Sequence, residues 1–143
     1  MTADLDAPCP PDELFGWIDD LDRYPEWLGI VRRTVRLPDG SAGELAWTVD
    51  LEAQLGPLAR AKRLRMERTV HDRPRLAVFE RRELDGREHG DWTLRAEVSP
   101  AGSGSRLEMR LRYDGRLWGS AVAAVLDREI ERSRERLLEL VSA

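Results

Sequence analysis

The side chains with the clearest potential for chemistry are charges that alternate with apolar residues in the middle of the chain. Arg68, Glu80 and Arg82 share a two-residue period with neighbouring apolar positions, which predicts that they face the same side of a sheet. Burying an unpaired charge is costly, so these groups must pair or meet water. Either Arg68 and Glu80 form an ion pair, or they orient a carboxylate, hydroxyl or carbonyl group of a ligand. A shift in register that exposes them is the third alternative.

Aromatic side chains form a second group of candidates. Trp47, Trp92, Tyr113 and Trp118 are large residues of the kind that usually fill a core when each is taken singly. The predicted strand pairing sets Trp92 beside Tyr113, however, and Trp118 follows five residues later. Such a wall suits a flat aromatic or polycyclic ligand. The other predicted ligand-binding residues are apolar and inward-facing: Met66, Val78, Leu94, Met109 and Val122.

The sequence predicts no catalytic residue, no metal site and no cofactor. It contains no phosphate-binding glycine loop and no recognisable spacing of metal ligands. His71 and His89 lie beside turns, where we expect them to be exposed, and with Cys9 they match no zinc or iron motif. Arg68, Glu80 and Tyr113 are the groups that a cyclase-like reaction would use, although position alone does not make them acids or bases.

Length and composition predict one domain, residues 1–143, that is long enough to bury a single core. The chain has 23 Lys and Arg against 27 Asp and Glu, and this net charge of -4 argues against a nucleic-acid partner. The apolar run at residues 121–126 is far shorter than the roughly 20 residues of a membrane span. We therefore expect a cytoplasmic protein without integral membrane association, either a monomer or a homodimer.

The pattern of apolar residues predicts a sheet covered by one long helix. Residues 2–7 are compatible with an edge strand, and Pro10-Pro11-Asp12-Glu13 is typical of a helix start. Two short helices or one broken helix then lead to Pro25. Period-two alternation runs from about residue 29 to 113, and apolar residues at spacings of three, four and seven predict a helix over residues 117–141.

The predicted register follows from the rule that opposite residues of an antiparallel pair face the same side. It sets Val70 opposite Leu76, Val78 opposite Ala96 and Leu94 opposite Leu111. One resulting row across the sheet contains Leu64, Arg82, Trp92 and Tyr113, and the next contains Met66, Glu80, Leu94 and Leu111.

These features resemble one known superfamily over essentially the whole chain. The segments that show this resemblance are Ala7-Pro8, Leu14-Phe15 with Trp17-Ile18, Asp22-Arg23-Tyr24-Pro25-Glu26-Trp27, and the turn between Val70 and Leu76. They are similar to the START-like or Bet v 1-like (SRPBCC) superfamily, in its bacterial polyketide cyclase/dehydrase-like branch. The resemblance implies an α+β helix-grip fold, in which a curved seven-stranded antiparallel sheet wraps a long C-terminal helix and two short helices follow the first strand.

The resemblance implies three functions. The first, which the mixed apolar and polar inner face favours, is binding or carriage of a small hydrophobic, aromatic or amphipathic molecule in a cavity between the sheet and the C-terminal helix. The second is an aromatase/cyclase-like enzyme that acts on a polyketide-type substrate. The third is a protein-interaction module related to toxin-like or coenzyme Q-associated members. The chain lacks the histidine and carboxylate iron site of oxygenase subunits with a related fold.

Overall fold

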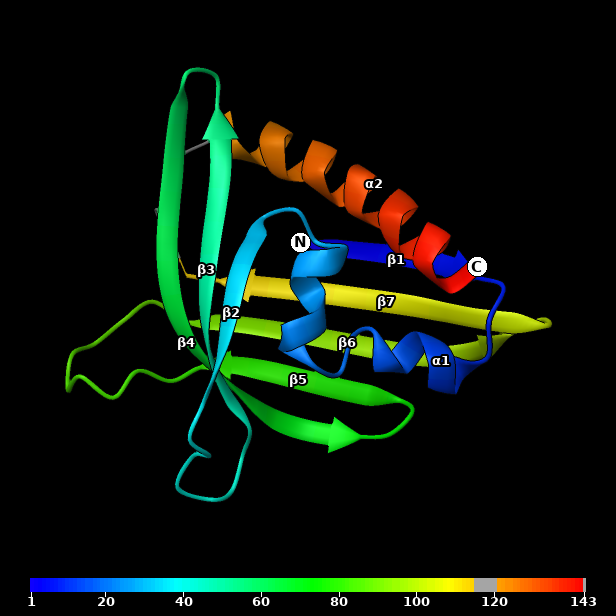
Figure 1. Ribbon diagram of the computed structural model, residues 1–143, viewed down its shortest axis with the longest axis horizontal. Helices are drawn as coiled ribbons and strands as arrows, with labels where there is room; N and C mark the ends of the chain where they lie inside the picture. The colour runs from blue at the N-terminus through cyan, green and yellow to red at the C-terminus, as the bar shows by residue number, and fades with distance from the viewer. Residues whose placement is uncertain (115–120, 143) are drawn as a thin grey trace.

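The computed structural model describes residues 1–114 and 121–142, leaving aside the side chains of residues 55 and 121–126, and its frame is a curved seven-stranded antiparallel sheet (Figure 1). The strand order is β1-β7-β6-β5-β4-β3-β2, so β1 and β2 form the two edges. The strands are β1 (Thr2–Ala7), β2 (Val31–Leu37), β3 (Ala46–Leu55), β4 (Leu58–Asp72), β5 (Leu76–Arg81), β6 (Trp92–Ala101) and β7 (Gly104–Tyr113). The predicted sheet and edge strand are confirmed.

Two separate short helices follow β1, which decides between the two alternatives for this segment. Helix α1 (Pro11–Gly16) begins with a proline and two carboxylates in its first turn, where exposed amide groups favour them. The 3-10 helix η1 (Leu21–Glu26) begins at Asp20, whose side chain accepts a hydrogen bond from the backbone nitrogen of Asp22 at 2.9 Å. The carboxylate cap therefore separates the two helices.

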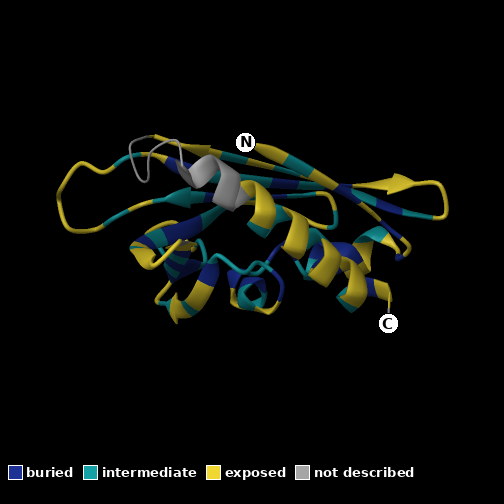
Figure 2. Cartoon of the chain, turned by 90° about the horizontal axis from the view of Figure 1, so that it is seen from above, coloured by how far each residue is buried: buried dark blue, intermediate teal, exposed yellow. Residues whose placement is uncertain are grey.

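Helix α2 (Ala121–Ser142) crosses the same side of the sheet and contacts β1 and β3 (Figure 1). Its buried residues face the sheet and its exposed residues face away, as Figure 2 shows. Ile130, Leu137 and Val141 follow the predicted apolar stripe, and the predicted residues 117–120 lie outside the described part of the chain. No helix among the described residues is long and apolar enough to cross a membrane.

The side of the sheet covered by α1, η1 and α2, called the inner face below, holds an aromatic core. Tyr24, Trp47 and Phe79 are fully buried there. The ring of Phe79 meets the ring of Trp47 edge-on at a centroid distance of 5.8 Å and that of Tyr24 at 6.1 Å. Phe79 thus joins the centre of the sheet to η1.

The predicted register is confirmed between β6 and β7. Trp92 lies opposite Tyr113, and Leu94 lies opposite Leu111. The strand β6 alternates cleanly between apolar residues and residues such as Arg95, so only one of its faces suits the core.

The predicted register is wrong around β5. Val70 lies opposite Val78 rather than Leu76, and Ala77 rather than Val78 lies opposite Ala96. The cause is an irregularity in β4 between Arg68 and Val70, where one extra residue reverses the alternation of faces.

The reversal changes which residues of β5 face the helices. Ala77 and Phe79 occupy the inner face, with Phe79 opposite Leu94 of β6. Val78 and Glu80 consequently lie on the opposite side, called the outer face below. The predicted rows that joined Glu80 to Met66 and Arg82 to Leu64 do not form, because Glu80 lies opposite Glu67.

Candidate functional site

An apolar cavity of about 270 Å³ lies between the inner face, the η1 region and α2. Strands β1, β2, β3, β4, β6 and β7 supply one wall, and α2 and the segment around η1 supply the other. The described wall consists almost entirely of hydrocarbon and aromatic surface. Its apolar side chains include Leu21, Leu28, Ile30, Val31, Val49, Leu51, Leu64, Leu107, Leu111, Ile130 and Leu137.

Five of the predicted ligand-binding residues contribute to this wall: Met66, Trp92, Leu94, Met109 and Tyr113. The rings of Trp92 and Tyr113 stack at a centroid distance of 5.4 Å and an interplanar angle of 29°. The register thus produces the aromatic pair that the sequence predicts, and this pair forms one part of the cavity wall.

Tyr24 and Trp27 lie in the cavity wall opposite the sheet, and their polar groups form hydrogen bonds with backbone oxygens of the protein. The hydroxyl of Tyr24 donates a hydrogen bond to the backbone oxygen of Ile18 at 2.8 Å. The indole nitrogen of Trp27 donates to the backbone oxygen of Trp17 at 3.0 Å. Burial raises the pKa of Tyr24 well above its ordinary range, and Asp19 adds to the effect. Tyr24 is therefore a neutral phenol that presents its ring, not a free acid.

Arg68 reaches the inner face but does not line the cavity. It lies opposite Phe79, and its Nη1 donates to the backbone oxygen of Asp19 at 3.0 Å. Burial lowers the pKa of its guanidinium, and the charge of Asp19 opposes that effect. Arg68 and Glu80 lie on opposite faces of the sheet, so among the three alternatives the ion pair is excluded and the shift in register holds for Glu80.

The outer face carries a charged cluster that includes Glu80 and Arg82, two residues that the sequence predicts to face inward. Glu67, which is 5% exposed, is its centre and accepts hydrogen bonds from Arg65 and Arg82. Arg82 also lies 3.9 Å from Glu80. Val78, Glu80 and Arg82 are therefore separated from the cavity by the sheet itself.

The remaining predicted ligand-binding residues also fall outside the described wall. Trp47 is fully buried beneath Arg36, whose guanidinium carbon lies 5.3 Å from the ring centre, and it acts as core. Trp118 and the side chain of Val122 lie outside the part of the chain that the structure describes.

Three important wall residues are not among those that the sequence predicts to bind a ligand. Tyr24, Trp27 and Arg134 all line the cavity. A signal was present, since Ile130, Arg134 and Leu137 are separated by four and three residues, the spacing of a single helix face.

A polar cluster outside the cavity fixes α1 to the turn between β4 and β5. Asp19, which is 9% exposed, has its Oδ2 atom 3.0 Å from Nε2 of His71 and 3.1 Å from Nη1 of Arg73. His71 also stacks on Phe15 of α1. These contacts give the cluster a structural role. Within residues 1–114 and 121–142, no group of three or more His, Cys, Asp or Glu residues is arranged to hold a metal ion.

Comparisons with solved structures show the same fold in several bacterial proteins. A protein from Thermus thermophilus is 18% identical, with a TM-score of 0.75, and the match covers 99% of this chain and 96% of that one. A START superfamily protein from Mycobacterium smegmatis is 14% identical, with a TM-score of 0.70 and coverage of 99% and 96%. The Zhui aromatase/cyclase from Streptomyces sp. R1128 is 12% identical, with a TM-score of 0.70 and coverage of 99% and 92%.

Comparisons of sequence identify the family. No curated protein matches the chain. A family model described as polyketide cyclase/dehydrase and lipid transport matches residues 1–141, nearly the whole length. The helix-grip arrangement of sheet and C-terminal helix agrees with that match. The chain therefore belongs to the polyketide cyclase/dehydrase and lipid transport family, and it shares its fold with a START superfamily protein.

Proposed function

We propose that the protein binds and carries a small hydrophobic or amphipathic molecule in the apolar cavity. The observation that supports this most strongly is the composition of the wall, in which the polar groups of Tyr24 and Trp27 already bond to backbone oxygens. A ligand that removes this apolar wall from water would be stabilised by about 25 cal/mol for each Å² of apolar surface that it buries.

The volume limits the size of the ligand. At about 30 Å³ for each molecule of liquid water, the cavity corresponds to roughly nine such volumes. A methylene group occupies a similar space, so a short aliphatic chain or one or two fused rings would fill the described volume. The stacked rings of Trp92 and Tyr113 favour a flat group at their end of the cavity.

The position of the charged residues supports binding over cyclisation. A cyclase-like reaction needs acid and base groups within hydrogen-bond reach of the reacting atoms. Of the three groups that the sequence offers for such a reaction, only Tyr113 lines the described cavity. Arg68 is bonded to the backbone of Asp19, and Glu80 lies on the outer face.

Calorimetric titration with a neutral probe, methyl decanoate, tests the proposal. The wild-type chain is expected to bind one molecule. Met109→Trp, which enlarges a side chain of the cavity wall, is expected to weaken binding at least about tenfold because the ligand loses its space.

The matched control is Val70→Trp, which adds the same ring to the exposed outer face. It is expected to leave the affinity unchanged. Equal binding by both variants, or no binding by the wild-type chain, would contradict the proposed function. Circular dichroism checks that both variants are folded.

A further inference from the structure

A polar groove adjoins the apolar cavity at the β1 edge of the sheet. The groove has a volume of about 480 Å³. The groove and the cavity share residues from both β1 and α2, including Thr2, Asp4, Ile130 and Arg134. The two hollows therefore lie side by side where α2 passes β1 (Figure 1), and we call this region the portal. An apolar chamber beside a polar groove suits a molecule with one apolar and one polar end.

The two charged residues that line both hollows, among those that the structure describes, are Asp4 and Arg134. Asp4 is already paired, because its Oδ2 accepts from Nη2 of Arg106 at 2.7 Å. Arg134 is paired at only one nitrogen, with its Nη1 donating to Glu131 at 2.9 Å. Glu131 is 66% exposed, so this ion pair is weak in water. The portal therefore offers a cation more readily than an anion.

Two nitrogens of the Arg134 guanidinium, Nε and Nη2, make no hydrogen bond with the described residues. Nε is buried, while the side chain as a whole is 39% exposed. A carboxylate binds arginine through two parallel N–H···O bonds, which specify both charge and direction. Leaving a buried N–H donor unpaired is costly, and a bound carboxylate would satisfy it.

We propose that the ligand is an anionic amphiphile, a carboxylate with a short apolar body, whose body fills the cavity and whose carboxylate binds Arg134 at the portal. This rests on the proposed function, since the apolar body must occupy the cavity. The groove beyond the portal carries charges of both signs, because Arg95 and Arg110 line it together with Glu108, Asp127 and Glu131.

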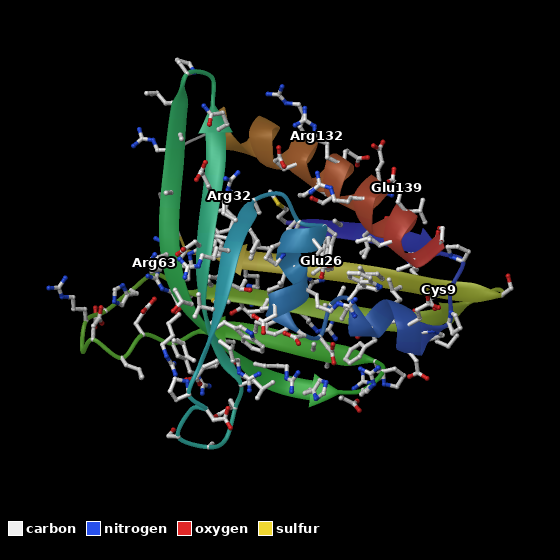
Figure 3. The ribbon with its side chains drawn as sticks, viewed as in Figure 1. Cys9, Glu26, Arg32, Arg63, Arg132 and Glu139 are labelled. Carbon is white, nitrogen blue, oxygen red and sulfur yellow. The ribbon has the colours of Figure 1, made fainter. Side chains whose placement is uncertain are left out.

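The test compares two probes that differ only in charge at the head, decanoate and methyl decanoate, at pH 7 and below the micellar concentration. Arg134→Gln removes the cation and keeps a polar side chain of similar length. The matched control is Arg132→Gln, two residues away on α2, because Arg132 is 67% exposed, pairs with Glu129 and lies on the solvent side of the helix (Figure 3). Calorimetry gives each dissociation constant, and thermal unfolding checks the fold.

The wild-type chain is expected to bind decanoate more tightly than the ester. Arg134→Gln is expected to weaken decanoate binding about tenfold or more, with the ester unaffected, and Arg132→Gln is expected to change neither. If both probes bind Arg134→Gln as they bind the wild-type chain, the proposed role of Arg134 is wrong and the apolar site stands. An equal loss for both probes would also overturn it, because it indicates damage to the cavity. If neither probe binds the wild-type chain, the proposed function itself fails.

Discussion

Truncation of Phe79 is the sharpest test of the strand register that builds the cavity. Phe79→Ala is expected to lower the free energy of unfolding by about 3–5 kcal/mol, because the ring is fully buried on the inner face. Its edge-on contacts with Trp47 and Tyr24 each add about 0.5–1.5 kcal/mol beyond burial, which favours the upper half of that range. Val78→Ala, at the next position, is expected to cost less than about 1 kcal/mol because Val78 lies half-buried on the outer face.

Urea unfolding at fixed pH measures both changes in unfolding free energy. An unchanged slope of that free energy against urea concentration shows that the variants differ in stability and not in the compactness of the unfolded state. Phe79→Leu is the second variant if the alanine variant does not fold. It keeps most of the apolar volume and loses the two ring contacts, so the expected cost is about 1–3 kcal/mol. A Val78→Ala cost equal to that of Phe79→Ala would refute the reasoning, since it would place Val78 in the core and remove the irregularity from β4.

Two further predictions concern acid stability and the β1 edge. Arg63 donates to both carboxylate oxygens of Asp50, at 2.7 and 3.2 Å, and these bonds lower the pKa of Asp50. The resulting stabilisation is present above the unfolded pKa of about 3.9 and is lost as the pH falls through the lower folded pKa. Asp50→Asn should therefore flatten the decline in unfolding free energy measured by urea between about pH 4 and pH 2, and an unaltered decline would count against the pair. A Cβ atom on Gly104 would overlap the backbone oxygen of Ala7, so Gly104→Ala should cost at least about 1–3 kcal/mol by separating β1 from β7. A Cβ atom on Gly16 would meet no atom within 4 Å, so Gly16→Ala should leave stability unchanged or raise it. Thermal unfolding measures both variants, and equal effects of the two substitutions would contradict the packing at Gly104.

The sequence predicts the sheet and its covering helix well because most strands have one face that suits water. In β6, Trp92 and Leu94 alternate with polar residues such as Arg95, and the observed pairing with β7 follows from that contrast. In β5 the contrast is missing, since residues 76–79 are all apolar and either face fits a core. The choice depends on the extra residue in β4 between Arg68 and Val70, which no local pattern of the sequence marks.

The candidate site was predictable only in part for a related reason. Alternation selects Met66, Leu94 and Met109, and all three line the cavity. The same alternation groups Glu80 with apolar neighbours and predicts that it faces inward, although the register places it on the outer face. Arg134 also lines the cavity, because helical spacing places it beside Ile130, where the aliphatic stem of an arginine packs readily against apolar surface.

Native mass spectrometry of the protein purified from its own host is the most direct test of the central claim, that the apolar cavity holds a small molecule. The expected result is a fraction whose mass exceeds that of the chain by one small hydrophobic or amphipathic molecule, released on denaturation and absent from Met109→Trp prepared in the same way. The chain mass alone in the wild-type protein, or the same adduct in Met109→Trp, would contradict the claim.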